Sequence, residues 1–204
     1  MGCSSSDPAK PTVGEEYAKL NMMQPQFSDY ENDFEKQLFF AINLLRNQPK
    51  NFVTSVKEVA ETHVLCKDKA TKDLIATLKS TTTLSAVTFS ADAIAAVRKN
   101  NEAMVAKDED TPTQGGNCDV YKSMEGNENA VCEEFTMCQY MGDSAKELIS
   151  LQLVLDWNRE GEMAKKSPLL AEDTKRVGIS NKAHKKTKNL IQFLYVMEKA
   201  NQMD

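Results

Sequence analysis

The spacing of apolar residues predicts an amphipathic helix over about residues 29–47. Apolar side chains recur there every three or four positions, which places them on one helical face: Phe34, Leu38, Ile42 and Leu45. Ser28 and Glu31 have the spacing of a capping box, so the helix is expected to begin beside Ser28. Pro49 disfavours helical backbone in the residue before it, so the helix is expected to end there.

The same periodicity predicts four further helices. Short apolar stripes after Phe52 and around Leu74 predict the first two. Ser90 and Ser144 precede two longer stripes, and a serine there can accept a hydrogen bond from the first turn of a helix. Helices are therefore expected to dominate the chain up to about residue 160.

The last part of the chain has a strand pattern. Residues 177–179 and 190–196 are short runs rich in β-branched and aromatic side chains, and a basic loop lies between them. Residues 107–130 are polar and turn-rich. Strands gathered after a run of helices predict an α+β fold, not the alternating pattern of a dinucleotide-binding sheet.

Composition bounds the class of protein. The chain has 204 residues, of which 41% are hydrophobic and 27% charged, as in one folded domain of ordinary size. The net charge of −5 disfavours nucleic acid as a partner, because phosphate binding usually requires a basic excess. No apolar run approaches the roughly 20 residues that a membrane-spanning helix needs.

The N-terminal segment fits a lipid-modification motif. Met1 is followed by Gly2 and Cys3, and Ser6 fills the last position of M-G-x-x-x-[ST], the pattern for myristoylation of Gly2. One myristoyl chain binds a membrane with an association constant of only about 10⁴ M⁻¹, which is too weak for a stable anchor. Palmitoylation of Cys3 would supply the second anchor. We expect residues 1–27 to be an acylated, flexible tail before a domain over 28–200. The alternative is an unmodified disordered tail.

The cysteines and histidines indicate neither a disulfide framework nor a zinc site. The chain has five cysteines, an odd number without C-x-x-C spacing, so we expect reduced thiols. The two histidines, His63 and His184, are far from paired cysteines. We therefore expect no metal and no cofactor.

Motif searches for catalytic or nucleotide chemistry are negative. The sequence lacks the glycine-rich phosphate-binding patterns and the G-x-S-x-G nucleophile motif. An EF-hand beginning at Asp108 would require Gly at position 113 and Glu at position 119, where the chain has Thr113 and Asp119. The acidic run 108–110 is therefore interpreted as a solvated turn.

Four lysines in the predicted hairpin allow two interpretations. Lys182, Lys185, Lys186 and Lys188 could simply solubilise the connection between two strands. They could instead contact an anionic membrane, at about 1 kcal/mol per lysine near the surface. His184 in this loop is expected to be exposed.

Several segments, taken in order, resemble the CAP superfamily of cysteine-rich secretory, antigen 5 and pathogenesis-related 1 proteins. The opening helix is similar in its N-x-x-R and x-P-x-x-F patterns, and later segments match weaker motifs of the family. The similarity runs from about residue 30 to 198. The matching segments are 39–52, 84–90, 127–130, 153–158, 177–179 and 192–195.

This resemblance implies a helix-rich, three-layer α-β-α sandwich with a small antiparallel sheet. It also implies a cavity that in many members holds two histidines and two acids and can bind a divalent metal. Glu128 matches the first acid and Asp156 lies near the second, whereas both histidines are replaced. A degenerate cavity without imidazoles favours no metal and no catalysis.

Two functions are in competition at this point. The acylation motif resembles that of the family's cytosolic, membrane-bound branch, which implies a non-catalytic, lipid-anchored binding protein on a cytosolic membrane face, for example of a cilium. Its partners would be anionic lipids, proteins or both. The alternative is a structural subunit of a large assembly, such as a ciliary or axonemal complex. A third, weaker hypothesis is a hydrolase that uses Glu128 and Asp156 as acid and base.

Overall fold

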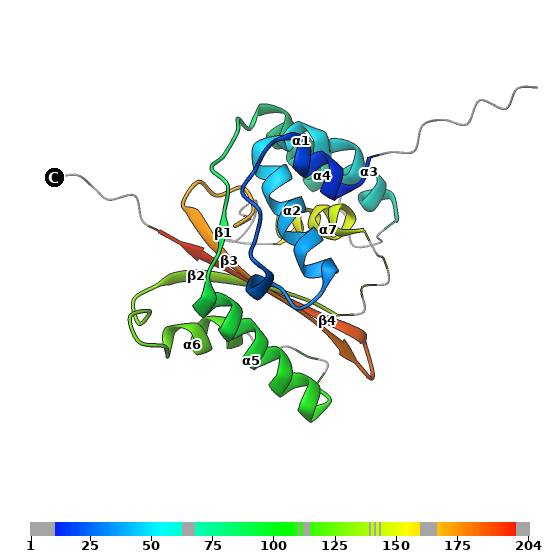
Figure 1. The fold of residues 1–204 in the computed structure, drawn as a ribbon. Helices are drawn as coiled ribbons and strands as arrows, with labels where there is room; N and C mark the ends of the chain where they lie inside the picture. The colour runs from blue at the N-terminus through cyan, green and yellow to red at the C-terminus, as the bar shows by residue number, and fades with distance from the viewer. Residues whose placement is uncertain are drawn as a thin grey trace, which may run out of the picture.

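The computed structural model describes residues 11–62, 68–109, 111, 115–138, 140, 142, 144–159 and 167–198. In these residues seven α-helices and a four-stranded sheet make a helix-rich, mixed α/β fold (Figure 1). The helices are α1 (Val13–Lys19), α2 (Asp33–Asn47), α3 (Val53–Thr62), α4 (Asp68–Ser80), α5 (Ala91–Lys107), α6 (Gly116–Lys122) and α7 (Ala145–Asn158). The strands are β1 (Thr88–Phe89), β2 (Val131–Cys138), β3 (Thr174–His184) and β4 (Lys188–Met197).

The sheet is mixed, which corrects the expected antiparallel sheet. Its strand order is β1-β3-β4-β2, with β3 and β4 as the two central strands. β1 pairs in parallel with β3, whereas β3–β4 and β2–β4 are antiparallel. The parallel pair is short because β1 has only two residues before Ser90 begins the next helix.

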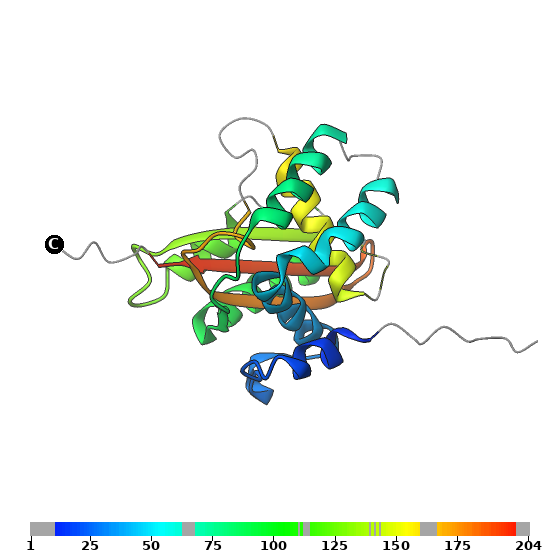
Figure 2. The ribbon, with the colours of Figure 1, turned by 90° about the horizontal axis from the view of Figure 1, so that it is seen from above.

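Helices cover both faces of the sheet. α5 and α6 lie on one face, and α2, α3, α4 and α7 lie on the other (Figures 1 and 2). β4 is therefore buried on both sides, and alternate residues face opposite layers. Ile191, Phe193 and Tyr195 join the larger core, whereas Leu194 and Val196 pack in the smaller core against α5 and α6.

Of the four helix ends that the sequence predicts, three agree with the structure: the starts of α5 and α7 and the end of α2. Ser90 and Ser144 accept hydrogen bonds from Ala93 N and Glu147 N, which confirms them as N-caps. α2 ends at Asn47, before Pro49, as predicted. Its start is different: Asn32 is the N-cap, and Ser28 lies in the preceding 3₁₀ turn.

Four short or interrupted elements escaped the sequence prediction: α1, α6, β1 and β2. α1 lies within the segment expected to be a flexible tail, yet its Tyr17 is only 1% exposed and stacks on Phe40 with ring centroids 4.1 Å apart. The domain boundary predicted at residue 28 therefore falls after a helix that packs on the core.

Candidate functional site

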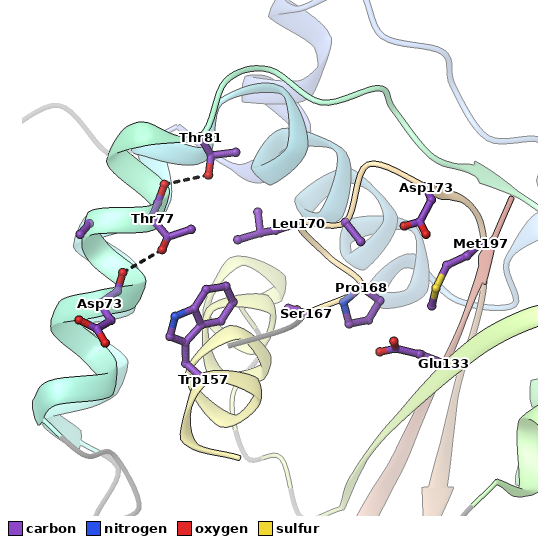
Figure 3. A pocket seen from close by; sticks show the side chains of 12 residues that line it. Asp73, Thr77, Thr81, Glu133, Trp157, Ser167, Pro168, Leu170, Asp173 and Met197 are labelled. Carbon is purple, nitrogen blue, oxygen red and sulfur yellow. Dashed lines mark hydrogen bonds between the residues drawn. The ribbon is translucent and has the colours of Figure 1, made fainter. Parts of the chain in front are cut away.

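A cavity of about 710 Å³ lies between α4, α7, the segment 167–173 and the ends of β2 and β4. Trp157, at the end of α7, forms part of its wall, and Met197 of β4 adds an apolar side chain. Figure 3 shows Asp73 on the α4 side, with Glu133 and Asp173 on the opposite side. These walls come from five parts of the sequence that only the fold brings together.

The lining of this cavity is acidic. Asp73, Glu133 and Asp173 contribute carboxylates, and the described lining contains no lysine or arginine. The nearby hydroxyls of Thr77 and Thr81 donate to main-chain carbonyls of α4, at 3.0 and 2.8 Å. The cavity therefore presents hydrogen-bond acceptors and an aromatic ring, which suit a positively charged group.

Asp156 lies directly behind the cavity wall. Its side chain is buried, and its Oδ2 accepts a hydrogen bond from the Ser167 hydroxyl at 2.6 Å. Arg159 Nη2 lies 3.2 Å from the other carboxylate oxygen. Burial raises the pKa of Asp156 to about 7, although the Ser167 hydrogen bond and the Arg159 charge oppose the shift. This carboxyl therefore changes charge near neutral pH.

Arg46 shapes the opposite wall from inside the core. Its guanidinium donates to four main-chain carbonyls, of which two belong to the segment 167–173 that lines the cavity. The acceptors are Ser85 O at 2.7 Å, Leu169 O at 3.1 Å, Ala171 O at 2.9 Å and Thr174 O at 3.1 Å. Burial lowers the pKa of Arg46 to about 10, and the Asp173 carboxylate opposes this shift.

Asn43, one turn before Arg46 on α2, fixes the segment that leads into β1. Its side-chain amide donates to Val87 O at 3.2 Å and accepts from Val87 N at 2.8 Å. The N-x-x-R pattern singled out in the sequence therefore uses both side chains to hold distant main chain in place. Neither side chain lines the cavity.

The two acids predicted for a shared cavity are not brought together. Glu128 is exposed in the turn between α6 and β2, and its Oε1 accepts from Gly126 N at 3.1 Å. Asp156 is buried in α7, on the other face of the sheet. Glu133 is the acid that β2 contributes to the cavity, and recognition of this strand would have placed Glu133 and Phe135 on one face.

The lysine hairpin is present, since residues 185–187 connect β3 to β4. Two of its four lysines are paired with acids. Lys182 Nζ lies 2.6 Å from Glu31, and this hydrogen bond raises the pKa of Lys182. Lys186 Nζ lies 3.6 Å from the Asp108 carboxylate and also donates to the main-chain carbonyl of Asp108 at 2.8 Å. Lys185 and Lys188 are exposed beside them.

His184 is buried, which corrects the expectation of an exposed loop histidine. It is the last residue of β3, and its Nδ1 accepts from Thr187 N at 3.2 Å across the hairpin turn. Its Nε2 lies 3.8 Å from Asp108 Oδ1. The tight turn folds this side chain inward against the end of α5.

Gly2, Cys3 and His63 lie outside the described residues. Within the described ranges, no cluster of three or more histidine, cysteine or acidic side chains is arranged to hold a metal ion. Over the same residues, no helix combines the length and apolar character needed to cross a membrane. Comparisons with family models, curated proteins and solved structures found no match to this chain.

Proposed function

We propose that this protein is a non-catalytic binding protein with a CAP-like α-β-α sandwich, held at a cytosolic membrane face by its N-terminus. The CAP-like interpretation is supported by helices on both faces of a small sheet and by the framework roles of Asn43 and Arg46. The acidic cavity is its binding site.

The acidic cavity is the observation that carries this proposal. Its volume is within the range of sites for small ligands or single side chains. Carboxylates beside an indole favour an ammonium group, because the ring face and the acids both attract positive charge. The ligand would therefore be an amine or a lysine-like side chain with an apolar stem.

The hairpin alone would hold the protein weakly at a membrane. Lys185 and Lys188 together contribute about 2 kcal/mol near an anionic surface, and Lys182 and Lys186 are already paired with acids. Acyl chains on Gly2 and Cys3 would supply the main anchor, since two chains bind far more stably than one.

Membrane fractionation tests the anchor. We expect wild type in the membrane fraction, Gly2→Ala in the soluble fraction and Cys3→Ser divided between them, because one acyl chain binds reversibly. Ser5→Ala, at a free position of the motif, is the matched control and should behave as wild type. Gly2→Ala protein that stays with the membrane would contradict the proposed anchor.

Tryptophan fluorescence tests the cavity, because Trp157 is the only tryptophan in the chain. Titration with n-hexylammonium should change its emission in a saturable way. Glu133→Gln should weaken binding about fivefold, since an exposed ion pair contributes up to about 1 kcal/mol. Glu128→Gln removes an acid outside the cavity and should leave binding unchanged. An equal loss in both variants, or no saturation in wild type, would contradict this site.

The alternative function is a structural subunit of a large assembly. It is favoured by two exposed apolar side chains near the N-terminal helix, Phe27 at 90% and Met23 at 64%. Such side chains commonly contact protein partners. Intact-mass measurement separates the two functions: myristate on Gly2 supports the membrane-anchored protein, whereas an unmodified Gly2 supports the subunit.

A further inference from the structure

Two cysteines face each other where α6 packs on the edge strand β2. Cys118 is in the first turn of α6, and Cys132 is the second residue of β2. Both are half-buried and pack against the smaller core. Their spacing in the sequence indicates only reduced thiols, because the packing of α6 on β2 cannot be read from it.

Hydrogen bonds from main-chain amides of α6 to the Glu134 side chain fix the relative position of the two cysteines. Glu134 of β2 accepts from Gly115 N at 2.6 Å, Asn117 N at 2.8 Å and Cys118 N at 3.3 Å, so its carboxylate caps the start of α6. Alternation along a strand puts Cys132 on the same face as Glu134. Glu134 therefore holds Cys118 beside Cys132 whatever the state of the thiols.

The two sulfurs also interact directly. The Cys118 thiol hydrogen-bonds to the Cys132 sulfur, which lowers the pKa of Cys132, and the Lys122 charge acts in the same direction against burial. The same hydrogen bond raises the pKa of Cys118. Cys132 is therefore the thiol that forms the nucleophilic thiolate first, with Cys118 beside it as the resolving thiol.

We propose that Cys118 and Cys132 form a reversible disulfide that joins α6 to β2 when the protein meets a small-molecule disulfide such as glutathione disulfide. The Cys132 thiolate attacks one sulfur of glutathione disulfide, which forms a mixed disulfide and releases one glutathione. Cys118, after loss of its proton, then attacks the Cys132 sulfur and releases the second glutathione. The protein loses two electrons and two protons, and glutathione disulfide gains both to become two thiols.

This disulfide is independent of the acidic cavity and of N-terminal acylation. It would tie an edge strand to the helix above it. β2 pairs with another strand, β4, along one side only, and the link adds a covalent attachment to the hydrogen bonds that Glu134 already makes with α6.

Alkylation after incubation in glutathione buffers tests the disulfide on the full chain. The chain has five cysteines. As glutathione disulfide increases, we expect the number of alkylated cysteines to fall by two, whether or not Cys3 carries an acyl chain, because the link consumes two thiols. Tryptic peptides should then contain Cys118 linked to Cys132, and reductant should restore both thiols. Cys138→Ser removes the third described thiol as a matched control and should still form the link.

A second variant separates a disulfide pair from an isolated reactive thiol. Cys118→Ser lacks the resolving thiol, so a glutathione adduct should accumulate on Cys132 instead of being released. Absence of the Cys118–Cys132 peptide in both wild type and Cys138→Ser would overturn the proposal. A stable glutathione adduct on Cys132 in wild type would overturn it as well, because Cys118 would then be unable to reach that sulfur.

Discussion

At the residue scale, Arg46 is a charged side chain that stabilises the fold from inside the core. It is fully buried, and its guanidinium donates hydrogen bonds to four main-chain carbonyls in separate parts of the sequence. Removal of such a group leaves several buried acceptors without partners, and each unsatisfied group costs free energy. The wall of the cavity therefore depends on a residue that does not touch the cavity.

We expect Arg46→Leu to lower the free energy of unfolding by about 3–5 kcal/mol. Urea denaturation followed by circular dichroism measures this loss. Arg98→Leu is the control, because its partly exposed side chain forms one ion pair with Glu31 and its loss should cost about 1 kcal/mol or less. A similar cost in both variants would show that the buried carbonyl contacts contribute little.

Asp156 should make stability depend on pH in a defined direction. The folded-state pKa of about 7 lies above the ordinary value of 3.8. Between these values the unfolded chain has lost the proton while the folded chain retains it, so stability should fall as pH rises through this window. The full effect is on the order of 4 kcal/mol.

Urea titrations of wild type and Asp156→Asn at several pH values test this direction. The stability of Asp156→Asn relative to wild type should increase from about pH 4 to pH 7 and then level off, because asparagine does not titrate there. Both proteins contain the other titrating groups, so the contributions of these groups cancel when the two free energies of unfolding are subtracted. A flat difference, or one of opposite slope, would mean that Asp156 is already ionised in the folded protein below pH 4.

Some residue roles were visible in the sequence and others were not. Asn43 and Arg46 belong to a local pattern on one helix, so they could be singled out. Glu133, Asp173 and the Cys118–Cys132 pair acquire their roles from contacts between distant segments, which no local spacing records. His184 was misread because a basic loop normally indicates exposure, whereas the tight turn folds this side chain inward.

At the element scale, α5 packs directly on β3 through Gly178. A Cβ atom at this position would overlap the main-chain carbonyl carbon and oxygen of Ala93 in α5. Main chain cannot move aside as a flexible side chain can, so glycine is required by this close approach. The glycine in the β-rich run 177–179 thus has a packing explanation.

Gly178→Ala should lower the free energy of unfolding by about 3 kcal/mol, since it forces α5 away from the sheet. Thermal and urea unfolding measure the effect. Gly14→Ala is the matched control: its Cβ would meet only Gln37 Nε2 at 3.8 Å, and alanine favours α1. The control should be neutral or slightly stabilising. If Gly178→Ala is equally neutral, α5 does not need this close contact.

The elements that sequence reasoning found share a strong local signal. Ser90 and Ser144 are good caps before long apolar stripes, and the two β-rich runs are uninterrupted. α1 and α6 have only seven residues each, too few for a clear period. β2 was missed because Glu133 and Glu134 interrupt its apolar residues; one faces the cavity and the other caps α6.

At the scale of the whole molecule, α1 is part of the folded body. Tyr17 stacks on Phe40 of α2, and its hydroxyl donates to Met23 O at 2.7 Å. Lys146 of α7 also pairs with Glu16 at 3.2 Å. The helix-rich class followed from the sequence, whereas the attachment of α1 and the order of the strands depend on long-range packing.

Tyr17→Ala should therefore cost about 3 kcal/mol of stability and release α1 from the core. Limited proteolysis reports the release, because cleavage within Val13–Lys19 should become faster than in wild type. Phe27→Ala is the control, since its ring is 90% exposed and should be dispensable for folding. Equal protection of α1 in both variants would show that Tyr17 does not hold it.

The strand order has a consequence for biosynthesis. β3 and β4 occupy the centre of the sheet but come last in chain order among its four strands. α2 is synthesised much earlier. Two of its buried charged residues form hydrogen bonds with β3: Glu35 accepts from Asn181 N, and Arg46 donates to Thr174 O. A nascent chain that stops before residue 174 would leave Glu35 without Asn181 and Arg46 without one of its four acceptors. The core can therefore close only after β4, which ends at Met197, has been synthesised, and until then the apolar surface of the helices stays open to aggregation.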